Sequence, residues 1–208
     1  MTIRRGEDWG EVGELGADDP VVGTDAALSA WVHERLAGGA ASGPVGLTGG
    51  DLHRTLGAPT RPEGLVPGAP LLVVECDVIE LSSSGGVHHA VAHVVGTAPG
   101  PHARWAGPTF VAMNAAFVGA ANLGPRAHPG DGLLDVTVGE LPWRQRRAAA
   151  RREPTGTHVP HPALTERRAR QWSPDADVSW SLTVDGVALG SHRAVSLRIL
   201  PGALTVVV

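Results

Sequence analysis

Apolar residues change their spacing along this chain, and the change divides it into two parts. Over residues 26–36 they lie along one helical face, which predicts a helix that is capped by Thr24 and ended by glycines. From residue 71 onward they occur in short runs separated by turns rich in Gly and Pro, which is typical of β-strands. We therefore predict an α+β fold that is mainly β, with a helix-strand appendage over residues 1–66 and a β domain over residues 67–208.

Six stretches of the sequence are predicted strands. They cover residues 44–48, 71–81, 87–95, 108–118, 133–138 and 178–208. In the last stretch Asp185-Gly186 is a strong hairpin signal, and we expect the returning strand to carry Val195, Leu197 and Ile199. Two packed sheets are expected to enclose the core. The predicted core residues are Phe110, Val111, Val136, Trp180 and Leu182.

Composition and charge narrow the class of protein. Of the 208 residues, 42% are hydrophobic, enough for a core, while 28 Gly and 17 Pro favour short strands over long helices. The net charge of −4 argues against bulk nucleic-acid binding, which is typical of basic domains. One substantial domain, or one domain and a fragment, fits this length.

Three features predict a cytoplasmic protein. The single cysteine, Cys76, cannot form an internal disulfide, which favours a reducing compartment. Residues 1–8 contain no apolar segment typical of a signal peptide. The longest apolar stretch, residues 110–123, is too short to span a bilayer.

A turn over residues 124–136 joins two of the predicted strands and holds the first candidate site. Its prolines and glycines exclude helix and force a sharp change of direction. Asp131 stands between two glycines, where its carboxylate can either cap turn amides or bind a hard cation together with nearby carbonyls. Both interpretations stay open from spacing alone.

Several motifs, in order, resemble the diacylglycerol kinase and related lipid kinase family. The turn, with Asp131-Gly-Leu-Leu-Asp-Val136 after a strand that contains Asn114, is similar to the family's signature. The segment around Asp185-Gly186 resembles its Asp-Gly-Glu segment, and residues 200–208 resemble its closing strand. The resemblance runs from about residue 71 to residue 208 and implies the family's C-terminal, sandwich-like β domain.

The same family implies a nucleotide site and a cation site. Gly49, Gly50 and Asp51 resemble the start of its Gly-Gly-Asp-Gly-Thr turn, whose amides cradle the ATP phosphates, and Asn114 matches a position near the nucleotide. For a structural Mg²⁺ the implied ligands are the Asp131 carboxylate and the backbone carbonyls of His128 and Leu133.

The sequence also departs from the family pattern. Leu52 and His53 replace the next Gly-Thr of the phosphate turn, and too few residues precede it for a doubly wound nucleotide domain. Asp185 matches the Asp that, with a Glu, works as acid and base on the lipid hydroxyl, but Val187 stands at the Glu position and cannot transfer a proton. Gly130 stands where the family often has a second acid.

An arginine-rich segment follows the turn. A helix predicted over residues 143–153 places Arg144, Arg147 and Arg151 on one face, and eight arginines lie between residues 144 and 170. Such a face is usually just solvated, but it also suits anionic lipid headgroups at about 1 kcal/mol per arginine. Nucleic acid is a less favoured partner because aromatic residues are not interleaved.

Three histidines lie on one predicted strand, which places His89 and His93 on one face and His88 on the other. Their proximity suggests zinc, but no Cys or acidic residue stands at a ligand spacing. We therefore predict solvated or hydrogen-bonded strand histidines.

Three functional hypotheses follow. The first is a non-catalytic, pseudokinase-like relative that binds a lipid, a small anionic ligand or a partner protein, because the phosphate cradle and base of a phosphotransferase are incomplete. The second is an active ATP-dependent lipid kinase that uses this reduced appendage or a nucleotide domain from another chain. The third is a binder of anionic surfaces or nucleic acid through the arginine-rich segment, at the periphery of a membrane. The sequence indicates no oligomeric state.

Overall fold

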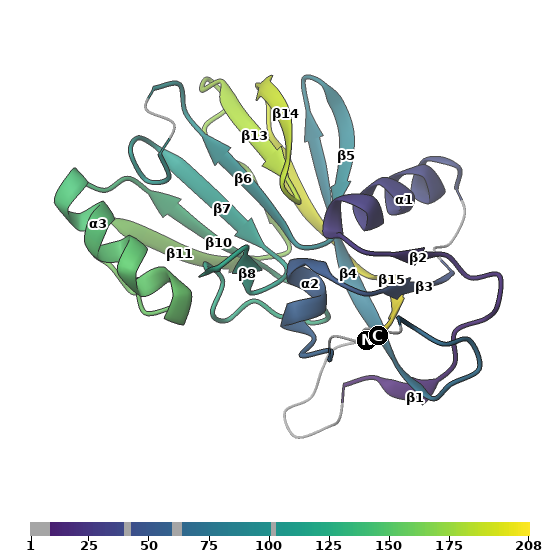
Figure 1. Ribbon diagram of the computed structural model, residues 1–208. Helices are drawn as coiled ribbons and strands as arrows, with labels where there is room; N and C mark the ends of the chain where they lie inside the picture. The colour runs from purple at the N-terminus through teal and green to yellow at the C-terminus, as the bar shows by residue number, and fades with distance from the viewer. Residues whose placement is uncertain (1–8, 40–42, 60–63, 101–102) are drawn as a thin grey trace.

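The computed structural model describes residues 9–39, 43–59, 64–100 and 103–208. The expectation about a signal peptide concerns residues 1–8, which lie outside this part. The first sheet contains β1 (Glu11–Gly13), β2 (Val21–Val22), β3 (Pro44–Leu47), β4 (Leu71–Ser83), β5 (Gly86–Ala90), β12 (Gln171–Trp172) and β15 (Ser196–Val207). Its order is β1-β4-β15-β3-β2, with β5 paired to β4 and β12 to β15 (Figure 1).

The second sheet has the order β11-β10-β7-β6-β13-β14. Its strands are β6 (His93–Thr97), β7 (Thr109–Met113), β10 (Leu134–Gly139), β11 (Leu164–Ala169), β13 (Trp180–Val184) and β14 (Val187–His192). A small hairpin, β8 (Phe117–Val118) and β9 (Ala121–Asn122), stands beside it. The helices are α1 (Asp25–Ala37), α2 (Gly50–Thr55) and α3 (Trp143–Arg152), followed by the 3₁₀ turn η1 (Glu153–Thr155).

The predicted mainly β fold of packed sheets is confirmed. The main core lies between the two sheets, where Ile79 and Leu81 of β4 pack with Phe110, Val136 and Leu182 of the second sheet. All five predicted core residues are buried. Alternation with period two is what places these side chains on the inner face of each strand.

The prediction of one strand over residues 87–95 is wrong. β5 ends at Ala90 in the first sheet and β6 begins at His93 in the second, so the chain changes sheets at Val91 and Ala92. His89 and His93 therefore do not share a strand face. The physical reason is that apolar alternation continues through the crossover, because both flanking strands line the same core.

Two further boundaries differ from prediction. The strand predicted over residues 108–118 ends at Met113, and the chain bends before β8. The strand that returns from Asp185-Gly186 is β14. Leu197 and Ile199 are instead buried in β15 of the other sheet, and Val195 is buried directly before it. The hairpin turn itself is as predicted, with φ of 46° at Asp185 and 84° at Gly186.

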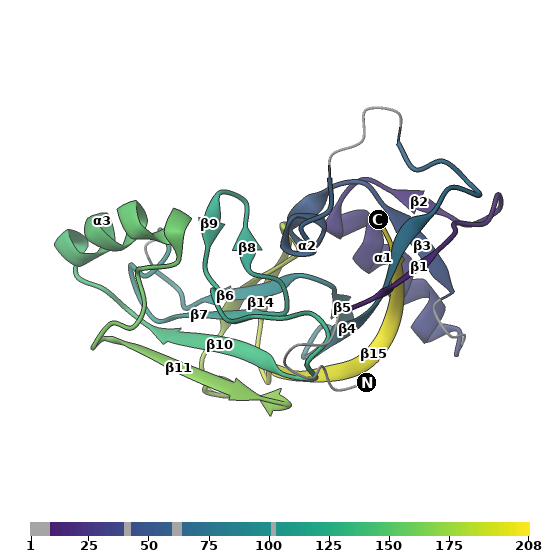
Figure 2. The same cartoon turned by 90° about the horizontal axis from the view of Figure 1, so that it is seen from below.

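The appendage and the β domain share the first sheet. β3 pairs with β15 in parallel, while β15 pairs with β4 along nearly its whole length, with one irregularity between Leu200 and Leu204. α1 packs against β5, and Figure 2 shows the appendage on the opposite side of the molecule from α3. A domain boundary at residues 66–67 stays a prediction, although the sheet continues across it. Within the described residues, the helices are too short and too polar to cross a bilayer.

Candidate functional site

Asp185 of the Asp-Gly motif holds the crossover between the two sheets. Its carboxylate accepts hydrogen bonds from the backbone amides of Val91 (2.7 Å), Ala92 (3.0 Å) and His93 (2.8 Å). These amides have left one sheet ladder before joining the next, so they need other acceptors. The side chain is only 6% exposed, and the geometry directs it to the backbone of its own chain.

Asn114 completes the same crossover from the other side. Its side-chain amide donates to the carbonyls of Asp77 and Val91, both at 2.8 Å, and its backbone amide donates to Ala92. The residue is fully buried. Asn114 and Asp185 therefore supply the hydrogen bonds that the crossover lacks, which is a structural role for two residues that the sequence comparison linked to the nucleotide and to catalysis.

Asp51, at the start of α2, is joined to this crossover through His93. His93 Nε2 lies 3.2 Å from the Asp51 carboxylate, which also accepts from the backbone amide of Gly119 at 2.9 and 3.0 Å. Arg54 donates to the Gly119 carbonyl and its guanidinium lies 3.7 Å from the centre of the Phe117 ring. These contacts fix α2 to the β8–β9 hairpin.

The amides that resemble a phosphate cradle are occupied by another carboxylate of the chain. Asp25, the first residue of α1, accepts hydrogen bonds from the backbone amides of Asp51 and Leu52. Gly50 has φ of 100°, and a Cβ built there would lie 2.5 Å from the Asp25 carboxylate. Gly49 precedes it in extended conformation and caps α2 without a side chain. Asp25 is the negative group at this helix start.

Burial and hydrogen bonding set the protonation of the junction cluster, which we define as Asp25, Asp51, His93 and Asp185. Desolvation raises the pKa of Asp185 to about 6 and also raises the pKa of Asp25. For Asp51 and His93, burial favours the neutral forms, but their mutual hydrogen bond and the surrounding charges outweigh it, lowering the pKa of Asp51 and raising that of His93. The contact between Asp51 and His93 therefore favours the charged form of each group.

The turn at Asp131 forms a second, separate place. Asp131 accepts from the backbone amide of Leu133 at 3.0 Å and pairs with the guanidinium of Arg168 on β11. The carbonyl of His128 accepts a long hydrogen bond of 3.4 Å from the Asp131 amide. Asp77 of β4 ties the turn to the first sheet through the amides of Gly132 and Gly202 (2.6 and 2.9 Å).

The carboxylate oxygens at this turn already have partners, which disfavours a bound metal ion. Each oxygen of Asp131 and of Asp77 accepts a hydrogen bond, and Arg168 already supplies a positive charge that a cation would bring. A second acid at Gly130 would require its neighbours to shift by a few tenths of an ångström, because a Cβ there would lie 3.0 Å from the Trp9 indole nitrogen and 3.1 Å from the Glu75 carbonyl. Mg²⁺ would have to displace the guanidinium, so the predicted site stays a prediction.

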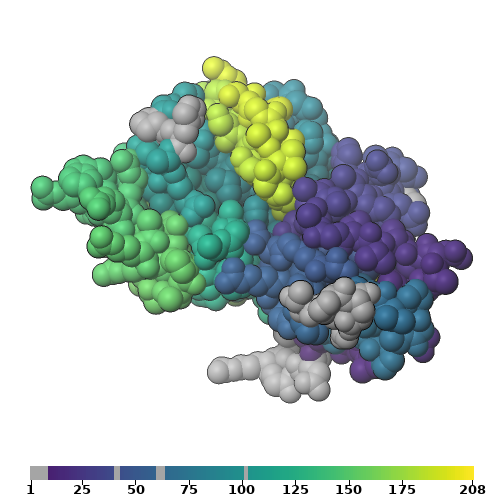
Figure 3. Space-filling view, viewed as in Figure 1, coloured from purple at the N-terminus to yellow at the C-terminus, as the bar shows by residue number. Residues whose placement is uncertain are grey.

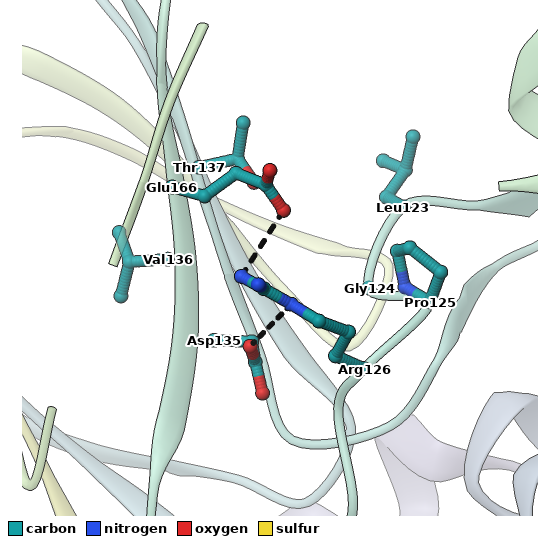
Figure 4. Close-up of a pocket in the computed structure, with 8 residues that line it drawn as sticks. All are labelled: Leu123, Gly124, Pro125, Arg126, Asp135, Val136, Thr137 and Glu166. Carbon is teal, nitrogen blue, oxygen red and sulfur yellow. Dashed lines mark ion pairs between the residues drawn. The ribbon is translucent and has the colours of Figure 1, made fainter. Parts of the chain in front are cut away.

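The hollow beside this turn is also too small for a ligand. Arg126 crosses it between Glu166 (3.2 Å) and Asp135 (3.9 Å), as Figure 4 shows. Its interior volume of about 10 Å³ is close to the minimum for one water. We therefore interpret it as an ion-paired seam between the turn and β11.

The arginine face of α3 forms a third place. Arg144, Arg147 and Arg151 are all exposed, as is Trp143, at 55%. The guanidinium groups of Arg144 and Arg147 lie 5.5 and 6.0 Å from the centre of the Trp143 ring. Figure 3 shows α3 projecting at the edge of the molecule, far from the appendage.

An open groove runs beside α3. Its volume is about 380 Å³, and it is lined by Ala103, Arg104, Trp105, Trp143, Arg146, Arg147, Ala150 and Glu153. Glu153 is buried and connects two of the lining residues, because its carboxylate accepts hydrogen bonds from Arg104 at 2.8 Å and from the indole of Trp105 at 3.2 Å. The groove joins an aromatic surface to several cations, which is a combination that suits an anionic surface.

The fold and its motifs define a sandwich-like β domain. A family model described as "YegS C-terminal NAD kinase beta sandwich-like domain" matches residues 87–208. The chain therefore belongs to the diacylglycerol kinase and YegS-like lipid kinase family through this C-terminal domain. No curated protein sequence matches the chain.

Three solved structures from Bacillus anthracis str. Sterne, whose names describe diacylglycerol kinases, share the fold. Their TM-scores are 0.63, 0.51 and 0.50, with sequence identities of 13%, 15% and 14%. The aligned part covers 90%, 79% and 79% of this chain and 76%, 66% and 68% of theirs, in the same order. At this identity the likeness concerns the fold alone.

The structure brings together three of the predicted site residues. Asp51, Asn114 and Asp185 converge on the crossover although they lie far apart in the chain. The sequence analysis does not identify Asp25 as a site residue, and it does not pair His93 with Asp51. An acidic residue that opens a helix, placed before a glycine turn, was the available signal for Asp25.

Proposed function

We propose that this chain is a non-catalytic member of the lipid kinase family, which binds a lipid, a small anionic ligand or a partner protein without transferring phosphate. The observation that carries the proposal is that the chain's own groups occupy the positions of the reaction. The Asp25 carboxylate accepts hydrogen bonds from the amides of the degenerate phosphate turn. Three backbone amides donate hydrogen bonds to the Asp185 carboxylate.

The position of the second acid supports the same proposal. Val187 is exposed at the start of β14, 48% accessible, so no carboxylate stands beside Asp185 on this hairpin. A general base has to reach the hydroxyl that it deprotonates. Asp185 is buried and points to the crossover, so it lacks that access in the described arrangement.

Calorimetry with an ATP analogue and Mg²⁺ tests the proposal directly. We expect no heat of binding from the purified chain, and no transfer of phosphate to diacylglycerol vesicles. Saturable binding, together with phosphate transfer that is lost in Asp185→Asn while the variant stays folded, would instead establish the active-kinase alternative. A partner chain that supplies the nucleotide domain would be detected by repeating the transfer assay in lysate fractions.

The arginine face of α3 supports a second proposal, docking of the chain to an anionic membrane. Trp143 offers an amphipathic ring at the interface, and Arg144, Arg147 and Arg151 offer charge. Attraction of this kind is electrostatic, so it weakens as salt screens the charges.

Liposome sedimentation tests this docking. We expect binding to vesicles that contain phosphatidylglycerol and none to neutral vesicles, with at least a tenfold loss in the triple variant R144Q/R147Q/R151Q. Arg193→Gln is a matched control, because Arg193 is exposed on the far turn before β15. Equal loss in the control, or binding to neutral vesicles, would overturn the proposal, and tighter binding to duplex DNA would favour nucleic acid instead.

A further inference from the structure

One side of α3 lines the groove that runs beside this helix. Trp143, Arg146, Arg147 and Ala150 stand at positions i, i+3, i+4 and i+7, so they share one side of α3. Arg144 is not among the residues that line the groove. The groove is therefore distinct from the arginine face of α3, with which it shares Arg147.

The loop before β7 supplies the other wall of the groove, and the fold holds this loop in place. Trp105 is 1% exposed and has a φ of 62°, which is unusual for a bulky side chain. Its carbonyl accepts from the amide of Leu141 at 2.8 Å, and its indole donates to Glu153 at 3.2 Å. The amide of Ala106 donates to the carbonyl of Ala103 at 2.9 Å. A wall that is already ordered loses little entropy when a ligand binds.

The groove combines apolar surface with positive charge. Two tryptophans and two alanines line it, together with three arginines and one glutamate. Arg104 pairs with Glu153 at 2.8 Å, so these two charges offset each other. Among the described residues, the ion pairs do not include Arg146 or Arg147. These two guanidinium groups therefore suit an oxyanion, because guanidinium binds carboxylate and phosphate through paired hydrogen bonds.

We propose that this groove binds a single-chain amphiphile, which is an alkyl or acyl chain with one carboxylate or phosphate head. The head pairs with Arg146 and Arg147, and the chain lies along Trp143 and Ala150. The volume of about 380 Å³ is at the lower end for pockets that hold one small ligand, so a two-chain phospholipid is too large. The inference rests on the ligand-binding part of the proposed function, and it gives the small anionic ligand a site and a chemical class.

The chain and the head of such a ligand should contribute separately to affinity. Each methylene group that the groove buries strengthens binding by up to about fourfold. The head alone pairs with arginines that are exposed to water, which is a weak interaction that salt screens. We therefore expect octyl phosphate to bind at least about tenfold more tightly than butyl phosphate, and inorganic phosphate to bind most weakly of the three.

Calorimetric titration of the full chain with octyl phosphate, below the concentration at which it forms micelles, tests the site. We expect one octyl phosphate per chain, and octanoate should compete with it. Arg146→Gln should weaken binding at least about tenfold, because it removes one charged donor. Ala150→Leu should weaken binding by a similar factor, because the larger side chain fills the groove.

Ala148→Leu is the matched control for Ala150→Leu. Both alanines are exposed on α3, but Ala148 does not line the groove. Leucine is a strong helix former, so both variants should keep the helix, which circular dichroism checks. Octyl phosphate should bind Ala148→Leu as tightly as it binds the unaltered chain.

Several results would overturn the site. They are an absence of octyl phosphate binding, an unchanged affinity in either Arg146→Gln or Ala150→Leu, and an equal loss in Ala148→Leu. Inorganic phosphate that binds as tightly as octyl phosphate would indicate an ion site in which the chain plays no part. Binding of phosphatidylglycerol vesicles without binding of octyl phosphate would leave the arginine face as the anionic contact.

An ATP analogue titrated into the same preparation separates this site from the proposed function. Binding of the analogue together with phosphate transfer would refute the non-catalytic proposal, while the loss of octyl phosphate binding in Ala150→Leu would still support the groove. If neither the analogue nor octyl phosphate binds, only the groove is overturned.

Discussion

Replacing Asp185 by Ala removes the acceptor that holds the crossover. The amides of Val91, Ala92 and His93 would then lie in a buried region without their partner. A change at this position is therefore expected to act on stability, although the motif resembles a catalytic one.

The magnitude follows from two opposing effects. Each buried amide that loses its acceptor costs about 1–3 kcal/mol, so three of them cost about 3–9 kcal/mol. Removing the buried charge returns about 3 kcal/mol at neutral pH, because the pKa of Asp185 rises from 3.8 to about 6 with its hydrogen bonds in place and each unit corresponds to about 1.4 kcal/mol. The unsatisfied amides outweigh this relief, and we expect Asp185→Ala to lower the free energy of unfolding by up to about 6 kcal/mol.

Urea unfolding followed by tryptophan fluorescence measures this loss, and hydrogen exchange locates it. We expect faster exchange at the amides of Val91, Ala92 and His93, with strands distant from the crossover less affected. Val187→Ala, an exposed position on the same hairpin, is the control and should change stability little. The reasoning fails if Asp185→Ala unfolds at the urea concentration of the unaltered chain with the three amides still protected.

Three other predictions concern the core, the groove and pH. Gly96→Ala should lower the free energy of unfolding by about 1–3 kcal/mol in urea, because a Cβ there would lie 2.1 Å from the Phe110 ring. Glu153→Gln should cost a similar amount, about 1–3 kcal/mol by thermal unfolding, because it weakens a charged acceptor of the buried Trp105 indole. The raised pKa of Asp185 means that its folded form keeps a proton that the unfolded chain releases above pH 3.8. Its contribution to stability therefore falls as pH rises from about 4 to about 6, and the stability difference from Asp185→Ala should grow by up to about 3 kcal/mol as pH is lowered across that range.

Much of the fold follows from local pattern. Alternation identified the strands that carry Phe110, Val136 and Leu182, because each buries one face against the opposite sheet. The α1 helix and its Thr24 cap were also predictable, since the Thr24 hydroxyl accepts from the amide of Ala27 at 3.2 Å. These features depend on neighbours in the sequence.

The site depends on partners far apart in the chain, and the sequence alone could not pair them. Asp185 accepts a hydrogen bond from the amide of Val91, and Asp131 pairs with Arg168. Arg168 lies on β11, a strand within the arginine-rich segment that the sequence analysis does not predict. The crossover after Ala90 was missed because both of its flanking strands face one core. Family resemblance located Asp185 but suggested a catalytic role, whereas the contacts of this residue are those of a backbone acceptor.

The parallel pairing of β3 with β15 has a consequence for synthesis of the chain. Pro44 faces Thr205, so β3, which also pairs with the short β2, joins the rest of the sheet through a strand about 160 residues further along, a separation that makes closure slow. While the ribosome makes the intervening strands, Val45 and Leu47 have no sheet to enter, and this early segment is exposed to chaperones and proteases. The pairing of β3 with β15 is therefore among the last contacts of the first sheet to form.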